Sequence, residues 1–433
     1  MKKWITSGIS SMLALSLVTA CGYDGAAPGS PSDQGSSAVN MDKPMTITIA
    51  VPPFADNEYE TILSKAAKMK FPQVTLEKVA LGPGGDYEVT VLAKGMKPDI
   101  MIVGLGSSFL IPLRDTGIAF DHSELSKANQ VDLGLLEPVR MDLAQHVDGN
   151  PDVTAIPYAL DTAALYYNKD IFDRFGVPYP KDNMTWDQVY ELARVLTRTE
   201  DGVQYRGLEP DMIDRVSGQT GLTIVDPKTN KASVNTEGWN RLFTMMKQIY
   251  DIPGNNQLKW AAAARESFSK TKDLAMHAGL GPDGYDSAHG LNWDLVTYPV
   301  TKEAPTTSLA LGGRAFSVTS LSTQKEEAFQ LVKLWLSEDV QKQLSAIGRA
   351  PALNSPEARK QFGTGLPGFK GKHLDALFML QAAKSPSVSK YEAEGAKQLR
   401  SAFQNMIKQN LDVNTALRQA EEQINKAVEQ LAK

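Results

Sequence analysis

The sequence predicts an α/β fold with two lobes, and three observations lead to this prediction. Short apolar runs that are typical of buried strands alternate with amphipathic segments that are typical of helices. The globular part, about 390 residues, exceeds the size at which one hydrophobic core stops growing. We find no internal repeat with a period of about 20 to 50 residues, so a solenoid is not expected. Each lobe should therefore consist of a sheet covered by helices.

The predicted strands are short runs of apolar and β-branched residues. The first, residues 45–51, reads MTITIAV, and the second, residues 99–103, reads DIMIV. Three more are expected later in the chain, at residues 273–281, 292–300 and 307–320. In α/β sheets, ligands bind outside the carboxyl ends of the strands, so the loops that follow these strands are the places to look for function.

The predicted helices carry apolar residues at helical spacing. Residues 59–69 place theirs on one face, and Pro72 ends this helix. Thr185 and Gln188 form a capping-box pattern at the start of another helix. Further helices are expected at residues 323–336 and 413–431. The last of these has one apolar stripe opposite Glu, Gln, Lys and Arg, which favours a helix docked on the rest of the fold.

The N-terminal residues 1–20 resemble a bacterial lipoprotein signal peptide. Lys2 and Lys3 precede an uncharged, largely apolar run that is too short to span a bilayer, since about 20 apolar residues are needed. Residues 17–21, LVTAC, then resemble a lipobox, in which the cysteine is lipidated and becomes the new N-terminus. Cys21 is therefore predicted to anchor the protein outside the cytoplasmic membrane. The alternative is an ordinary secretory signal followed by an unrelated cysteine.

Residues 21–43 are predicted to form a flexible tether behind the lipidated cysteine. They are rich in Gly, Ser, Ala, Pro and Asp and show no hydrophobic period. About 22 such residues span a root-mean-square distance of roughly 25 Å. The globular part is expected to begin near Pro44.

Composition and motifs exclude several classes of function. The formal net charge is −5, so the chain is not built to bind nucleic acid or anionic lipid headgroups. Its single cysteine excludes an internal disulfide. The five histidines are widely spread and no HExxH motif occurs, so we predict no metal site. No GxxxxGK[ST] motif occurs either, and we expect neither a nucleotide-hydrolysing site nor a cofactor.

Four stretches resemble the bacterial extracellular solute-binding proteins, in particular the sugar-type receptors of ABC importers. Residues 157–197, which begin PYALDTAALYYNKDIF, closely resemble the hinge and following helices of that family. Residues 97–118 resemble its second ligand loop, residues 309–351 its return strand and helix, and residues 411–426 its C-terminal helix. Together these stretches cover nearly all of the globular part.

The resemblance implies a two-lobed periplasmic-binding-protein type II fold, with a central sheet flanked by helices in each lobe. The chain would cross the hinge more than once, so that residues 44–157 and 306–347 form lobe I and residues 158–305 and 348–433 form lobe II. Ligand would bind in the cleft and favour the closed state, which it contacts from both lobes. Closure would present a new surface to a membrane permease.

The resemblance thus implies a monomeric receptor that captures a small solute, most simply a carbohydrate or oligosaccharide, and that is not an enzyme. Two alternatives remain open at this stage. A surface sensor could use the same fold, since a fold does not fix a function. A cell-surface glycosidase would need a pair of carboxylates at a suitable separation across a cleft.

Carbohydrate sites combine carboxylates and amides, which bind hydroxyl groups, with aromatic rings that cover the apolar face of a sugar. Asp161 lies where the family often has a hinge acid, and its alternative role is to cap the next helix. Asp56 and Asn57 follow the first strand, and either could instead cap a helix. Arg314 could face the cleft or form a salt bridge between the lobes. The predicted ligand residues are Phe54, Asp56, Asn57, Gly104, Ser107, Ser108, Tyr158, Asp161, Asp283, Tyr285, Arg314 and Tyr391.

Overall fold

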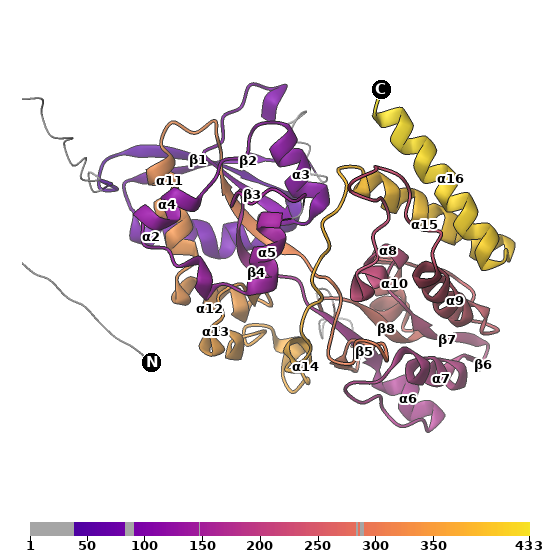
Figure 1. The fold of residues 1–433 in the computed structure, drawn as a ribbon. Coiled ribbons are helices and arrows are strands. Elements are labelled where there is room, and N and C mark those ends of the chain that lie inside the picture. Colours follow the sequence, from indigo (N-terminus) through magenta and orange to yellow (C-terminus); the bar gives the residue numbers. More distant parts are fainter. Residues whose placement is uncertain (1–38, 83–90, 147, 283–284, 286–289) are drawn as a thin grey trace, which may run out of the picture. The chain divides into compact units, whose positions relative to one another are not determined.

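The computed structural model describes residues 39–82, 91–146, 148–282, 285 and 290–433. The predicted signal peptide, Cys21 and most of the tether lie outside these ranges. In the described part, helices flank two separate β-sheets, as the sequence predicts (Figure 1). No helix in the described ranges has both the length and the apolar character needed to cross a membrane. The same ranges contain no group of three or more His, Cys, Asp or Glu residues arranged to hold a metal ion.

The first sheet has six strands in the order β11-β4-β10-β3-β1-β2. Strand β1 pairs in parallel with β2 and β3, whereas β10 runs antiparallel to β3 and β4. The prediction for residues 45–51 is confirmed, because they form β1. The strands are β1 (Met45–Val51), β2 (Val74–Ala80), β3 (Ile100–Leu105), β4 (Ile156–Leu160), β10 (Gly313–Val318) and β11 (Ala350–Pro351).

The second sheet has five strands in the order β6-β7-β8-β5-β9. Strand β7 is parallel to β8, and β5 lies antiparallel between β8 and β9. The runs predicted at 273–281 and 292–300 contain β8 and β9. The strands are β5 (Ala163–Asn168), β6 (Arg198–Glu200), β7 (Val203–Glu209), β8 (Leu274–Leu280) and β9 (Trp293–Thr297).

Helices on the first sheet bury their apolar faces in a core that includes Phe316 and Trp335. The predicted helix at 59–69 forms as a π-helical turn at Tyr59–Leu63 followed by α2, and the short helix α1 precedes it. The predicted helix at 323–336 forms as α11. The helices are α1 (Asp56–Glu58), α2 (Ser64–Lys70), α3 (Ser107–Asp115), α4 (Ser123–Ala128), α5 (Pro138–His146), α11 (Lys325–Trp335) and α12 (Glu338–Ala346).

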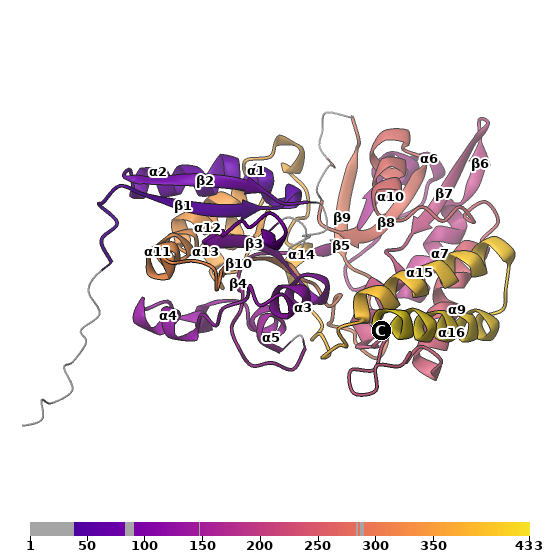
Figure 2. The ribbon, with the colours of Figure 1, turned by 90° about the horizontal axis from the view of Figure 1, so that it is seen from above.

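Helices on the second sheet cover two cores, one of which includes Trp239 and Phe403 and the other Trp293 and Phe369. The capping box of Thr185 and Gln188 is present at the start of α7. The C-terminal helix α16 packs against α15, as both views show (Figures 1 and 2). The helices are α6 (Lys169–Phe175), α7 (Trp186–Leu196), α8 (Ile213–Val216), the 3-10 turn η5 (Ser217–Thr220), α9 (Glu237–Asp251), α10 (Ala262–Glu266), α14 (Ala376–Met379), α15 (Glu392–Gln409) and α16 (Val413–Leu431). Helix α13 (Pro356–Lys360) instead packs against α12 and β11 of the first sheet.

The chain passes from one sheet to the other a few residues later than predicted. Strand β4 belongs entirely to the first sheet, so the first passage follows Leu160 instead of residue 157. The run predicted as a strand at 307–320 forms β10 only from Gly313, because Leu309 and Leu311 pack in a core of the second sheet. Strand β11 pairs with β4 and places the last passage after Pro351. Sheet membership depends on hydrogen-bond partners, which the local sequence pattern does not reveal.

Candidate ligand site

A pocket of about 330 Å³ lies at the carboxyl end of β3. Leu105, Gly106, Ser107 and Ser108 form one wall, together with Gly312, which directly precedes β10. The opposite wall comes from elements that flank the second sheet, including α8, η5 and the first turns of α15. The pocket is therefore lined by segments that are more than 200 residues apart in the sequence.

The first wall brings the backbone close to the pocket. Gly312 lies so near to β3 that a Cβ atom at this position would collide with the carbonyl oxygen of Leu105. Ser107 and Ser108 form the first turn of α3, where peptide N–H groups have no partner within the helix. These N–H groups and the helix dipole favour a hydrogen-bond acceptor at this end of α3.

The second wall contains a charged pair with one unused acceptor. The Arg400 guanidinium donates from Nη1 to Oδ2 of Asp214 at 2.7 Å. The other oxygen, Asp214 Oδ1, is buried and accepts no hydrogen bond from the described residues. Burial raises the pKa of Asp214, and the neighbouring Arg400 and Arg215 guanidinium groups oppose this rise. A buried carboxylate oxygen without a partner is costly unless a ligand or water fills the position.

The other charged groups in the pocket already have partners. Arg215 donates from Nη1 to Asp211 Oδ1 at 3.1 Å. The Glu392 carboxylate accepts from the backbone N–H groups of Ile224 at 3.0 Å and Val225 at 2.9 Å, which fixes this part of the wall to α15. Burial raises the pKa of Glu392 to about 7. The polar groups left in the lining include the Ser107 and Ser108 side chains and the buried Asp214 Oδ1, which has no hydrogen-bond partner in the described part of the chain.

This arrangement suits reversible binding of a molecule with hydroxyl or amine donors. The lining includes Leu105, Leu143, Leu222 and Ile224, which can contact the apolar parts of such a molecule. No aromatic side chain lines the pocket within the described part of the chain. Hydrogen bonds and aliphatic contacts, instead of ring stacking, would therefore provide the affinity.

Of the predicted residues, Ser107 and Ser108 line this pocket. Asp161 lies at its edge, because its backbone N–H donates to the carbonyl of Gly312 at 3.2 Å. Asp161 does not cap the next helix, since Asn168 performs that role for α6. Gly104 lies in β3 with the ring of Phe109 against its Cα, and Gly104 is not part of the pocket lining.

The predicted first ligand loop lies elsewhere. The ring of Phe54 packs edge-on against Phe109, with the ring centroids 5.8 Å apart. Asp56 forms an ion pair with Lys78, and Asn57 is exposed at the start of α1. Neither side chain caps the helix, so the capping alternative is wrong.

Two predicted aromatic residues are corrected by their burial. Tyr158 has no exposed surface, stacks on Phe316 at 4.1 Å and donates its hydroxyl proton to Glu58. Tyr285 is also fully buried and bonds through its hydroxyl to His277. Neither tyrosine has surface available to a ligand in this structure.

Arg314 forms an ion pair with the buried Glu58 at 2.9 Å, within one lobe and not between the lobes. Tyr391 is half-buried against the core of the second sheet and precedes Glu392. Asp283 lies outside the described residues.

Sequence reasoning missed Asp214, Glu392 and Arg400. Asp214 follows the carboxyl end of β7, so the rule that ligands bind beyond strand ends could have identified its loop. Arg400 lies 186 residues further along the chain in the middle of α15, and no local pattern distinguishes it from other arginines on exposed helix faces.

A model of the family described as bacterial extracellular solute-binding protein matches residues 63–364, which is more than half of the chain. Solved structures with similar folds include a sugar transporter from Rhizobium etli in an open conformation, with 21% identity, a TM-score of 0.70 and coverage of 88% of this chain and 99% of that chain. An ABC substrate-binding protein from Listeria monocytogenes in complex with cycloalternan has 17% identity, a TM-score of 0.70 and coverage of 88% and 98%. A sugar-binding protein from Xanthomonas citri has 16% identity, a TM-score of 0.68 and coverage of 90% and 98%. These likenesses establish a shared two-lobed fold.

Proposed function

Because the chain belongs to the bacterial extracellular solute-binding protein family and so acts outside the cytoplasmic membrane, we propose that it is the substrate receptor of an ABC importer. Its ligand would be a carbohydrate or oligosaccharide, which it would deliver to a membrane permease. The observation that carries this proposal is the pocket at the end of β3, which is lined by the first turn of α3 and by Asp214, the residue with the unused acceptor.

Three features support a carbohydrate as the ligand. The pocket offers an acceptor for hydroxyl groups and N–H donors at the start of α3. Its aliphatic lining can contact the C–H surface of a sugar. The similar structures include a sugar transporter and a sugar-binding protein.

Binding requires no covalent chemistry in this proposal. A ligand that contacts both walls binds the closed arrangement better than an open one, so it shifts the population toward closure. Closure would then be the signal that the permease recognises. We further propose that the receptor is a monomer and that a lipid on Cys21 holds it at the membrane.

A thermal-shift screen of the purified globular part against mono- and oligosaccharides tests the ligand class. A ligand at about 100 times its dissociation constant adds about 2.7 kcal/mol to the free energy of unfolding, which a shift in melting temperature reveals. Uronates, peptides and polyamines serve as comparison ligands. Stabilisation by one of these and by no carbohydrate would overturn the carbohydrate assignment.

Two further measurements separate this function from its alternatives. Steady turnover of chromogenic glycosides would indicate a glycosidase, because a transport receptor releases its ligand unchanged. The liganded receptor should stimulate ATP hydrolysis by its permease complex. Absence of stimulation would favour a sensor.

Replacing Asp214 by asparagine should weaken binding of the best carbohydrate at least about tenfold, or 1.4 kcal/mol. The amide keeps the size of the carboxylate but can no longer accept from both Arg400 and the ligand. Isothermal titration calorimetry measures the loss. Asp251→Asn, which changes an exposed acid paired with Lys247, is the matched control and should bind normally. If the Asp214 and Asp251 variants bind the carbohydrate with equal affinity, Asp214 does not contact the ligand.

Replacing Asp161 by alanine should also weaken binding more than about tenfold while the protein remains folded. The side chain lies beside Gly312 at the edge of the pocket, where it can accept a hydrogen bond from a ligand hydroxyl. Calorimetry provides the affinity, and circular dichroism checks the fold. An unchanged dissociation constant would show that Asp161 is structural.

A further inference from the structure

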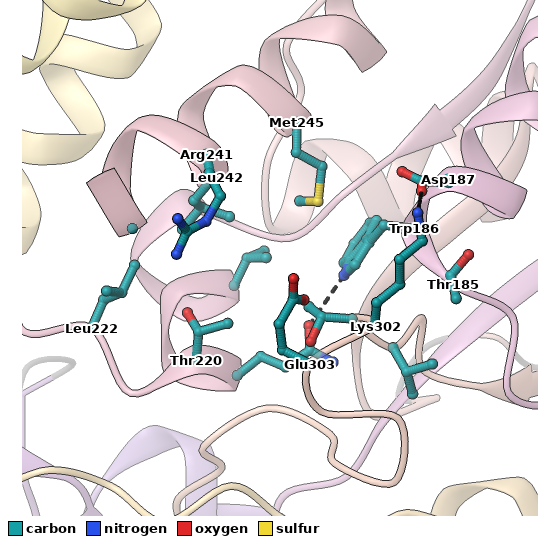
Figure 3. A pocket seen from close by; sticks show the side chains of 15 residues that line it. Thr185, Trp186, Asp187, Thr220, Leu222, Arg241, Leu242, Met245, Lys302 and Glu303 are labelled. Carbon is teal, nitrogen blue, oxygen red and sulfur yellow. Dashed lines mark hydrogen bonds and ion pairs between the residues drawn. The ribbon is translucent and has the colours of Figure 1, made fainter. Parts of the chain in front are cut away.

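We propose that a second pocket, formed by α7, α9 and residues 300–303, binds a small apolar or aromatic molecule that carries one positive charge. This pocket adjoins the carbohydrate site, with which it shares Leu222, and has a volume of about 490 Å³, within the range of about 300–1,000 Å³ that is typical of small-molecule sites. Figure 3 shows the side chains that surround it. The proposal does not depend on the function assigned above.

The polar groups on the inner wall are already satisfied by one another. The Trp186 indole donates from Nε1 to Gln219 Oε1 at 3.1 Å, the hydrogen bond drawn in Figure 3. Gln219 Nε2 donates to the carbonyl oxygens of Pro299 and Thr307, both at 2.9 Å. The Thr220 hydroxyl donates to the carbonyl of Ser217 at 3.2 Å. The inner wall therefore has little hydrogen-bonding capacity left for a ligand.

What this wall offers is apolar contact. Leu242 and Met245 project from α9 and Trp186 from the start of α7 (Figure 3). Val300 also lines the pocket. A methionine thioether adapts to irregular shapes and makes favourable contacts with aromatic rings. The buried part of a ligand should therefore be a ring or an alkyl group.

The rim of the pocket contributes the charge selectivity. Lys302 pairs with Asp187 at 2.7 Å, and Arg241 pairs with Glu237 on its own helix. Glu303 is exposed and makes no hydrogen bond or ion pair with the described part of the chain. Both rim cations thus pair with other acids, whereas Glu303 has only the longer-range attraction of Lys302. A ligand with an ammonium group would supply the missing partner, and a carboxylate ligand would not.

The experiment compares 2-phenylethylammonium with 2-phenylethanol, which have the same skeleton and differ in charge. Titrations follow the indole N–H signal of Trp186 in ¹⁵N-labelled protein, assigned with a Trp186→Phe variant. At about 0.3 kcal/mol per heavy atom, a probe of about nine heavy atoms binds at about 10 mM or tighter. We expect saturable shifts, with the ammonium binding about three- to fivefold tighter, because an exposed ion pair adds up to about 1 kcal/mol.

Two variants test the assigned roles. Glu303→Gln should make the two probes bind equally, whereas Glu266→Gln, a change at another exposed acid, which lies on α10 and pairs with Lys270, should keep the preference. Leu242→Phe should fill the pocket and abolish both titrations, with its unfolding curve confirming that it folds. Equal affinities in the unchanged protein would overturn the charge selectivity. Linear, non-saturating shifts at about 10 mM, or shifts that persist in Leu242→Phe, would overturn the site.

Discussion

Replacing Glu58 by alanine should lower the free energy of unfolding by about 3–5 kcal/mol, the loss typical of removing one partner from a buried charge cluster. The Glu58 side chain has no exposed surface. Its carboxylate lies 2.9 Å from Arg314 Nε and 2.7 Å from Arg349 Nε, and it accepts the Tyr158 hydroxyl at 2.7 Å. One carboxylate thus joins α1, β4 and β10 with the residue that precedes β11.

The cost arises because the partners remain buried when Glu58 is removed. The Arg314 and Arg349 side chains are only 13% and 14% exposed, so water cannot replace the lost carboxylate at little cost. Burial and the adjacent Glu58 carboxylate raise the pKa of Tyr158 well above its usual value, so the tyrosine stays neutral and loses an acceptor.

Urea denaturation of both variants, followed by tryptophan fluorescence, measures the effect. Glu60→Ala is the matched control: this acid is two residues away, is 54% exposed and pairs with Lys78 at 2.6 Å. Its removal should cost less than about 1 kcal/mol. Losses of similar size for the two variants would show that the Glu58 cluster does not stabilise the fold as the geometry indicates.

Two buried histidines should together make the free energy of unfolding about 4 kcal/mol smaller at pH 5 than at pH 7, an effect that buried acids oppose. Burial lowers the pKa of His122 to about 4 and that of His277 to about 3, below the usual value near 6.5. As the pH falls, each histidine therefore takes up a proton at a higher pH in the unfolded chain than in the folded chain. The stability that each neutral ring provides is complete above pH 6.5 and is lost as the pH falls toward the folded-state pKa.

Burial keeps the ring of His122 neutral, and a neutral ring fits its hydrogen-bond partners. Its Nε2 accepts the backbone N–H of Val318 at 2.8 Å, while Nδ1 bonds to the carbonyl oxygen of Val153. One nitrogen is thus an acceptor and the other a donor, as only a neutral imidazole allows. Protonation would remove the acceptor.

Two buried acids stabilise the folded protein as the pH falls, which opposes the effect of the histidines. Burial raises the pKa of Glu209 and of Glu392 to about 7, so the folded protein binds protons there that the unfolded chain binds only near pH 4.5. Their contribution becomes more favourable as the pH falls from about 7 to 4.5. The total pH dependence therefore combines both signs, and the histidine effect must be isolated with a variant.

His122→Gln provides this isolation. At pH 7 the variant should have a smaller free energy of unfolding than the unchanged protein. This difference in free energy should be about 2 kcal/mol smaller at pH 5, because only the unchanged protein has His122 to protonate on unfolding. Urea denaturation at both pH values measures this difference, in which all other titrating groups cancel. A difference that stays constant would contradict a neutral, buried His122.

Local sequence pattern was sufficient to predict the fold class and several of its elements. The strand at Met45–Val51 and the capping box at Thr185 are encoded by neighbouring residues, because alternation of side chains and helix capping operate within a few positions. The two α/β lobes follow from the alternation of such elements and from chain length. Ser107 and Ser108 were predicted from the resemblance to the family's second ligand loop, and the structure includes both in the lining of the pocket.

The tertiary structure alone decided which polar and aromatic groups are free to bind. Tyr158 and Tyr285 look like candidate ring-stacking residues in the sequence, yet both are buried in cores that assemble from distant segments. Asp214 and Arg400 meet across 186 residues. The physical reason is that burial and hydrogen-bond partners are properties of the assembled chain: a side chain's residue type sets what it can bind, and its neighbours in space determine whether that capacity is already used.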